Sequence, residues 1–224
     1  MARVNPVVAI LASAALALAG CGGGGGSTPA PVTTPPATGV FTQPAALALS
    51  ATDVQQVIAQ SVAEAQARGT PAVISVTDRV GNVLAVYRMT GAPSMVTIRP
   101  GAGPQQLDLQ SVQVPASLAA IAKAITGAYL SSGGNAFSTR TASEIVQETF
   151  PPEPATVGLG SGPLFGVQFS QLPCSDLEFP TLGKTIGPHP SPLGLAGDPG
   201  GFPLYKNGVL VGGVGVKATT DYGF

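Results

Sequence analysis

Apolar positions repeat with a helical period near the start of the folded part of the chain. They recur every three or four residues over 54–65, which predicts an amphipathic helix. Ser50 followed by Asp53 has the pattern of a capping box at its start. Gly69 and Pro71 predict its end. The apolar positions of this helix are Val54, Val57, Ile58, Val62 and Ala65.

Two pairs of β-branched or apolar runs predict hairpins. Residues 72–77 and 83–88 flank a polar turn at 79–82, and we expect this pair to pack under the helix. Residues 202–205 and 209–216 flank Asn207-Gly208, a dipeptide typical of two-residue hairpin turns.

Two further helices are expected between the hairpins. One begins at Ser117 and ends at 131–134, and a short one begins with a capping box at Thr141 and Glu144. Two Pro-rich segments are predicted to be irregular, 91–115 and 151–203. Together these elements predict an α/β (α+β) fold over 47–224, an antiparallel β-sheet flanked by α-helices with a long Pro/Gly-rich loop insertion at about 150–197.

The first twenty residues are typical of an export signal. Arg3 precedes the apolar run Val7–Ala19, which is too short to span about 30 Å of hydrocarbon. The run ends in Leu18-Ala19-Gly20-Cys21, which resembles a bacterial lipobox with Cys21 as the lipidated residue. The alternative is a plain secretory signal with an incidental cysteine.

Residues 21–46 are rich in Gly, Pro and Thr and predict an uncharged tether. An acylated Cys21 would hold the domain at a membrane through the lipid alone. No Asp follows Cys21, and by resemblance to other lipoproteins this implies the outer membrane, facing the periplasm.

Charge and composition narrow the functional class. The chain has 10 Lys and Arg against 11 Asp and Glu, so it lacks the excess of cations that a nucleic-acid binder needs. It has one His and two Cys, which leaves few candidates for a zinc site or a Cys/His pair. No catalytic constellation is found, and we do not expect an enzyme.

Two sequence blocks, 73–93 and 200–216, together with the two longer helices, resemble the GlcG/HbpS family, which is related to the PduO C-terminal domain. The resemblance implies an α/β domain with an antiparallel sheet, assembly into oligomers, and heme as a cofactor. The insertion at about 150–197 is longer than the family's short link. Relatives continue into a C-terminal helix after the point where this chain ends, so the chain is either a fragment or lacks that helix. No His lies in the matching blocks, so no axial ligand carries over.

Four residues are candidates for contact with a cofactor. His189, between two prolines, could ligate heme iron, or it could be a solvent-facing loop residue. Tyr129 and Phe137 could stack on a porphyrin edge, or they could be core residues. Lys123 could pair with a propionate, or it could be a solvated surface charge.

Other residues are weaker candidates. Met89 is a soft ligand or, as we expect, core filler, and Arg88 and Arg99 are expected at the surface. Cys174 is a buried thiol, an intermolecular disulfide partner or a thiolate ligand.

Two functions of different classes follow. The first is a lipid-anchored, non-enzymatic binding protein for heme or a related tetrapyrrole, acting in sensing, storage or handover. The second is an envelope interaction module that has lost the cofactor. An enzyme acting on a small hydroxy acid rests only on analogy and ranks last.

Overall fold

The structure is a computed structural model, and it describes residues 46–99, 109–146, 155, 160–162, 164, 167 and 188–223. All of these residues lie in one compact unit, Pro44–Phe224. The expected signal peptide, lipobox and almost all of the tether lie outside the described residues, as does most of the expected insertion.

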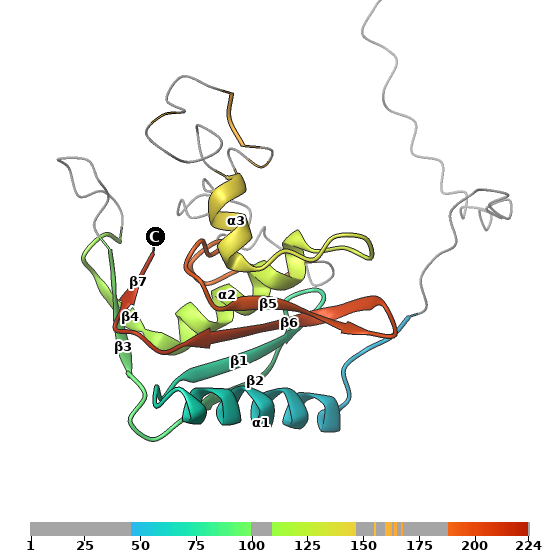
Figure 1. The fold of residues 1–224 in the computed structure, drawn as a ribbon, viewed down its shortest axis with the longest axis horizontal. Helices are drawn as coiled ribbons and strands as arrows, with labels where there is room; N and C mark the ends of the chain where they lie inside the picture. Colours follow the sequence, from blue (N-terminus) through green and yellow to red (C-terminus); the bar gives the residue numbers. More distant parts are fainter. Residues whose placement is uncertain are drawn as a thin grey trace, which may run out of the picture. The chain divides into compact units, whose positions relative to one another are not determined.

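The main sheet has four strands in the order β2-β1-β6-β5, and all of its neighbours are antiparallel. Figure 1 shows the red β5–β6 hairpin beside the green β1–β2 hairpin. The predicted hairpins are therefore confirmed and are joined through β1 and β6. The strands are β1 (Val73–Asp78), β2 (Val83–Arg88), β5 (Gly201–Lys206) and β6 (Val209–Lys217).

Turn chemistry fixes both hairpins as the sequence predicts. Asn207 and Gly208 have φ of 50° and 77°, the left-handed pair that a tight hairpin turn requires. In the β1–β2 turn, the Asp78 carboxylate accepts the main-chain N–H groups of Val80 and Asn82, at 2.9 and 2.8 Å. The Asp78 side chain thus supplies acceptors for two main-chain N–H groups of the turn.

Helix α1 (Ala51–Ala67) covers one face of the sheet and begins with the predicted capping box. The Ser50 hydroxyl accepts the Asp53 N–H, and the Asp53 carboxylate accepts the Ser50 N–H at 2.8 Å. The pKa of Asp53 is lowered well below its usual range, chiefly by the Lys206 ammonium that donates to it and also by Ser50. The cap therefore also links α1 to β5.

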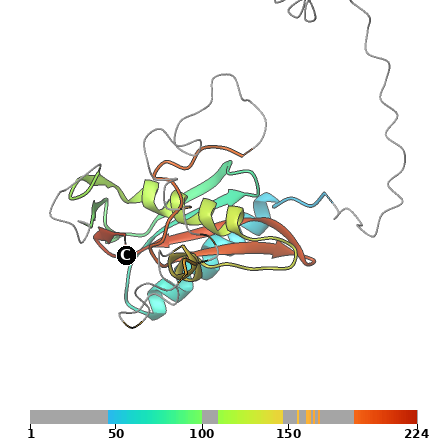
Figure 2. The same ribbon diagram turned by 90° about the horizontal axis from the view of Figure 1, so that it is seen from above.

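Helix α2 (Ala116–Leu130) covers the opposite face and lies across the β5–β6 hairpin (Figure 2). Its approach is close because the strands present glycines to it. A Cβ on Gly213 would lie 2.0 Å from the Ala124 carbonyl oxygen, and one on Gly215 would lie 2.0 Å from that of Ala120. Only residues without a side chain fit under this helix, which explains the glycines that the sequence places in β6.

A second, three-stranded sheet corrects one prediction. Residues 91–115 were expected to be irregular, but 95–98 and 113–115 are strands. Val96 and Val114 are buried there, and their burial stabilises strands that are too short for a sequence pattern to reveal. The sheet has the order β4-β3-β7, with β3 parallel to β7. Its strands are β3 (Met95–Ile98), β4 (Gln113–Pro115) and β7 (Asp221–Tyr222).

The start of the third helix also differs from the prediction. Helix α3 (Thr139–Ile145) is capped by Ser138, whose side chain accepts the Thr141 N–H at 3.2 Å. The expected capping box of Thr141 and Glu144 is wrong, because Ser138 is an equally good cap one turn earlier. Glu144 instead lies near Arg140, at 3.7 Å on an exposed surface.

The predicted fold class is confirmed: the described part is a mixed α/β domain with antiparallel strands flanked by helices, apart from the one parallel pair β3–β7. None of the helices in this part of the chain is long and apolar enough to cross a membrane.

The glycine contact predicts a large effect of one methyl group. Gly213→Ala should lower the free energy of unfolding by about 3 kcal/mol, because the new Cβ overlaps the Ala124 carbonyl and α2 must shift. Urea denaturation followed by circular dichroism measures this loss. Gly133→Ala is the matched control, since nothing lies within 4 Å of its Cβ position. Equal midpoints for the two variants would contradict the close-packing argument.

Candidate functional site

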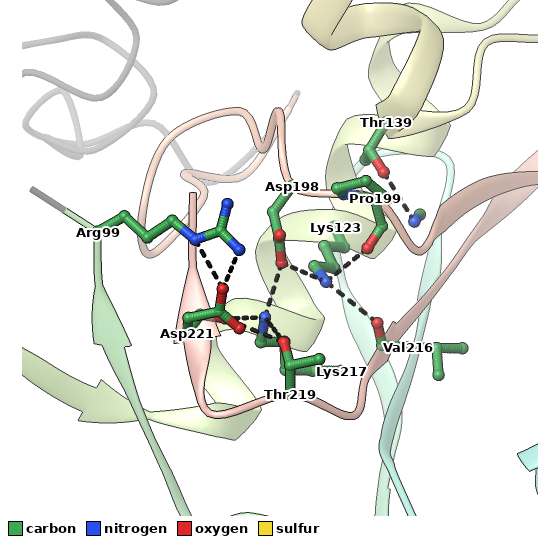
Figure 3. Close-up of polar contacts among 10 residues, drawn as sticks. Arg99, Lys123, Thr139, Asp198, Pro199, Val216, Lys217, Thr219 and Asp221 are labelled. Atoms are coloured by element: carbon green, nitrogen blue, oxygen red, sulfur yellow. Dashed lines mark hydrogen bonds and ion pairs between the residues drawn. The ribbon is translucent and has the colours of Figure 1, made fainter. Parts of the chain in front are cut away.

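A buried ionic cluster lies where α2, the end of β6 and the segment before β5 meet (Figure 3). Lys123 of α2 and Lys217 of β6 are only 2% and 1% exposed. Both ammonium groups contact the same atom, Oδ2 of Asp198, at 2.5 and 2.8 Å. Two cations therefore share one carboxylate in the interior.

Main-chain oxygens complete the surroundings of Lys123. Its Nζ donates to the carbonyl oxygens of Pro199, at 2.7 Å, and Val216, at 3.2 Å. With the Asp198 carboxylate these contacts match the three protons of an ammonium group. In this arrangement Lys123 ties α2 to the start of β5 and the end of β6, and it has no donor left for a ligand.

Lys217 is saturated in the same way. Its Nζ donates to the Thr219 hydroxyl at 2.9 Å and to the main-chain oxygen of Asp221, in addition to Asp198. The Asp221 carboxylate faces outward to Arg99, the residue that follows β3 (Figure 3). The Thr219 side chain and then Arg99 lower the pKa of Asp221 to about 2. The cluster thus connects the main sheet to the smaller one.

Burial controls the charge of Lys123. Loss of water around the ammonium lowers its pKa from 10.5 to about 8, and the charge of Lys217 adds to this, whereas Asp198 opposes it. The expectation that Lys123 is a solvated surface charge is therefore wrong. Helix α2 is apolar nearly all round, and a lysine in such a helix is buried with it. That signal was available in the sequence, but the partners Asp198, Lys217 and Asp221 were not.

A second constellation brings two predicted residues together. The Tyr129 hydroxyl lies 2.7 Å from the carbonyl oxygen of His189 and 2.9 Å from that of Val80. The His189 N–H also donates to Val80, at 2.8 Å. Gly81 makes room for this contact, since a Cβ there would lie 2.2 Å from the Tyr129 oxygen. Burial raises the pKa of Tyr129 to about 12, so its hydroxyl stays protonated and acts as a donor.

Val80, Gly81, Tyr129 and His189 form this corner. It fixes the main chain of His189 and makes no hydrogen bond to its ring. The side chain is half-buried, and the part of the chain that the structure describes offers its imidazole no hydrogen bond. Phe137 is also half-buried, and its N–H donates to Ser131 Oγ at 2.9 Å. Tyr129 and His189 are thus brought together by a hydrogen bond from the Tyr129 hydroxyl to the main-chain oxygen of His189.

The remaining candidates behave as core or surface residues, or lie outside the description. Met89 is buried and its sulfur accepts the Ala72 N–H at 3.4 Å, which confirms it as core filler. Arg88 and Arg99 are exposed, as expected. Cys174 lies outside the described residues. Among the described residues, no group of His, Cys, Asp or Glu is arranged to hold a metal ion.

An apolar cavity of about 610 Å³ opens between α1 and the β5–β6 hairpin, and no sequence pattern predicted it. Val214, Val216 and Phe202 line it from the sheet, and Ala65 lines it from α1. Glu64 and Arg68 stand on its rim, where they pair with each other at 2.6 Å. Its described lining contains no His, Cys, Met or Tyr side chain, and it shares no residue with the corner around His189.

Because two lysines share one aspartate, substitutions in this cluster should lower the free energy of unfolding by unequal amounts. Asp198→Asn should cost about 3 kcal/mol of unfolding free energy or more, because it leaves two buried ammonium groups side by side. Lys123→Met should cost less, since Lys217 then pairs with Asp198 one to one. Urea denaturation at pH 7 compares the variants, and a greater loss in Lys123→Met would refute the account.

The pH dependence provides the control for this comparison. Lys123 binds its proton more weakly in the folded chain, with a pKa of about 8 instead of 10.5, so its contribution to stability is worst below pH 8 and improves toward pH 10. Between pH 8 and pH 10, the free energy of unfolding of the unmodified chain should therefore rise relative to that of Lys123→Met, by at most about 1.4 kcal/mol per pH unit.

Comparison with known proteins gives one family match. Residues 49–97 match the family model described as HbpS-like, "Haem degrading protein HbpS-like". Among curated protein sequences, none matches the chain significantly.

Several solved structures are similar to the chain, among them the following three. The PduOC:heme complex is 24% identical and covers 77% of this chain and 84% of its own, with a TM-score of 0.43. Protein ORFY of Klebsiella pneumoniae, of family model DUF336, is 20% identical over 81% and 87%, with a TM-score of 0.47. HbpS is 19% identical over 81% and 84%, with a TM-score of 0.41. The family match confirms the predicted GlcG/HbpS-type resemblance for residues 49–97, which contain α1, the β1–β2 hairpin and most of β3.

Proposed function

We propose that this chain is a lipid-anchored, non-enzymatic binding protein of the bacterial envelope that takes heme or a related tetrapyrrole. The observation that carries the heme part of the proposal is the match of residues 49–97 to the family model "Haem degrading protein HbpS-like". Storage, sensing or handover of the ligand are the roles that such a protein would serve.

The corner around His189 offers one nitrogen donor for the iron of a heme. The main chain of His189 is held by its N–H bond to Val80 and by the Tyr129 hydroxyl, so the ring is attached to a rigid base. Its imidazole has no partner among the described residues and is partly exposed. When bound, heme would supply an iron centre that accepts a nitrogen donor of this kind. His189 would be that donor.

The charges of a tetrapyrrole's propionates need partners at the surface. Lys123, the candidate from the sequence, has all three donors engaged within the protein, so it serves this role only if the ionic cluster opens. Arg79 is exposed in the same turn as Val80 and Gly81, next to the corner. We therefore assign Arg79 as the cation that orients the ligand there.

The apolar cavity supplies a second place for a flat ring. Its floor is formed by β5 and β6, and its volume of about 610 Å³ is in the range of small-molecule sites. It offers apolar surface and no ordinary iron donor, whereas the corner offers the donor. Variants at the two places therefore report on different binding modes.

Lipidation at Cys21 is the second part of the proposal. It rests on the sequence Leu18-Ala19-Gly20-Cys21 after an apolar run and on the uncharged tether that follows. A diacylated cysteine would anchor the domain stably, because two acyl chains are needed for lasting membrane binding. The outer membrane, facing the periplasm, is the proposed destination.

Hemin titration tests the ligand. The chain without residues 1–20, carrying Cys21→Ser, should bind hemin at micromolar concentration with a shifted Soret band. His189→Ala should weaken binding at least tenfold and alter the band, because the iron loses its donor. Tyr129→Phe should weaken it less, since only one hydrogen bond to the His189 carbonyl is lost.

Ser61→Trp is the control, because it places a large ring in the cavity and leaves the corner intact. Unchanged binding in Ser61→Trp together with loss in His189→Ala assigns the ligand to the corner. The reverse result moves the ligand to the cavity. Well-folded protein with the spectrum of free hemin would overturn the proposal and favour the interaction module.

Membrane fractionation tests the anchor. In a bacterial host, the full chain should sediment with membranes and incorporate labelled palmitate, and Cys21→Ser should abolish both. Cys174→Ser is the matched control and should change neither. Membrane association that persists in Cys21→Ser would contradict lipidation at this site.

A further inference from the structure

The apolar cavity between α1 and the β5–β6 hairpin has a floor that α1 leaves partly uncovered. Val214 and Val216 alternate along β6 with Gly213 and Gly215, which lie beneath α2, so the two valines face the α1 side of the sheet. Phe202 of β5 pairs with Val214 and extends this floor, and Phe202 is 49% exposed. Aliphatic and aromatic surface is therefore open to a ligand here.

The two walls of the cavity have similar lengths. Its lining follows α1 from Gln60 to Arg68 and β6 from Val214 to Ala218. These stretches span about 12 Å of helix and about 13 Å of strand. The chain enters β1 at Val73 soon after Arg68, and β1 begins opposite the end of β6, so Arg68 and Ala218 lie at the same end. The cavity thus suits an extended chain whose head group lies at the Arg68 end.

Arg68 supplies a positive charge at that end. Its Nε donates to Glu64 Oε1 at 2.6 Å, and its two terminal nitrogens make no hydrogen bond to any residue that the structure describes. A guanidinium has five N–H donors in a fixed fork, and the two oxygens of a carboxylate match such a fork. The terminal nitrogens of Arg68 can therefore receive a carboxylate at the rim of the cavity.

The charges of the rim decide between kinds of amphiphilic ligand. Among the described lining residues, Arg68 is the one cation and Glu64 is the one anion. Heme brings two propionates and an iron, and this described lining has neither a second cation nor an ordinary iron donor. An acyl chain with a single carboxylate needs one cation at one end and apolar surface along its length, and the lining offers both.

We propose that this cavity binds a free fatty acid, with the acyl chain on the floor of Val214, Val216 and Phe202 and the carboxylate on Arg68. Burial of the methylene groups supplies most of the affinity, and the ion pair with Arg68 sets the direction of the chain. The site shares no lining residue with the corner around His189. Fatty acid and heme would therefore bind at separate places.

Isothermal titration calorimetry with laurate tests this site on delipidated chain from residue 21 to 224 with Cys21→Ser, without hemin. Laurate below its micellar concentration should bind one to one, and methyl laurate, an ester without the charge, should bind about tenfold more weakly. Equal affinity for the acid and the ester, or tighter binding of dodecylammonium, would overturn the role of Arg68. Folded protein that binds no laurate would overturn the proposal and leave the cavity to a protein segment.

Substitutions of the rim pair should act in opposite directions. Arg68→Gln removes the cation and should weaken laurate binding about tenfold, whereas Glu64→Gln removes the competing anion and should strengthen it. Arg140→Gln is the matched control, because Arg140 is 73% exposed like Arg68, pairs with Glu144 one helical turn away, and does not line the cavity. Weaker binding in Glu64→Gln, or an equal loss in Arg140→Gln, would refute the assignment.

Two further measurements locate the bound chain. Ser61→Trp fills the cavity and should abolish laurate binding, and circular dichroism melts show whether this variant is folded. Saturating hemin should leave laurate bound, because the corner around His189 lies outside the cavity lining. Laurate binding that persists in Ser61→Trp, or laurate displaced by hemin, would overturn a separate fatty-acid site. The laurate titration contains no hemin, so this proposal and the heme proposal can fail independently.

Discussion

The contact between α2 and the β5–β6 hairpin is the constraint on which the rest of the domain depends. Helix and strands meet at main-chain distance because Gly213 and Gly215 lie under Ala124 and Ala120. Dispersion attraction falls steeply with separation, so the close approach that these glycines allow strengthens the contact between α2 and the strands. Any bulk at these strand positions would separate the helix from the sheet and expose the core on that side.

The ionic cluster depends on this approach. Lys123 reaches Asp198 and the carbonyl of Val216 because α2 lies directly on the strands. The cost of burying its charge is offset in part by three acceptors, the Asp198 carboxylate and the carbonyl oxygens of Pro199 and Val216. Lys217 and Asp221 then extend the network to β7 and to Arg99, which follows β3. The smaller sheet also packs on the shared core through Val96, Val114 and Tyr222.

Local chemistry was predictable from the sequence where a few adjacent residues decide it. Ser50 with Asp53 and the Asn207-Gly208 turn are such cases, and both are found as expected. Strands β3, β4 and β7 were missed because their pairing joins residues that are far apart in sequence. The same distance hid Asp198 and Lys217 as the partners of Lys123. Tyr129 and His189 were named as candidates, but their meeting through main-chain oxygens follows only from the fold.

The corner around His189 also bears on the position of the ionic cluster. Val80 of the β1–β2 turn and Tyr129 of α2 both hold His189, nine residues before Asp198. The segment that carries Asp198 to Lys123 and Lys217 therefore starts from a point fixed by two other elements. A displacement of the β1–β2 turn would consequently be transmitted along this segment toward the buried charges.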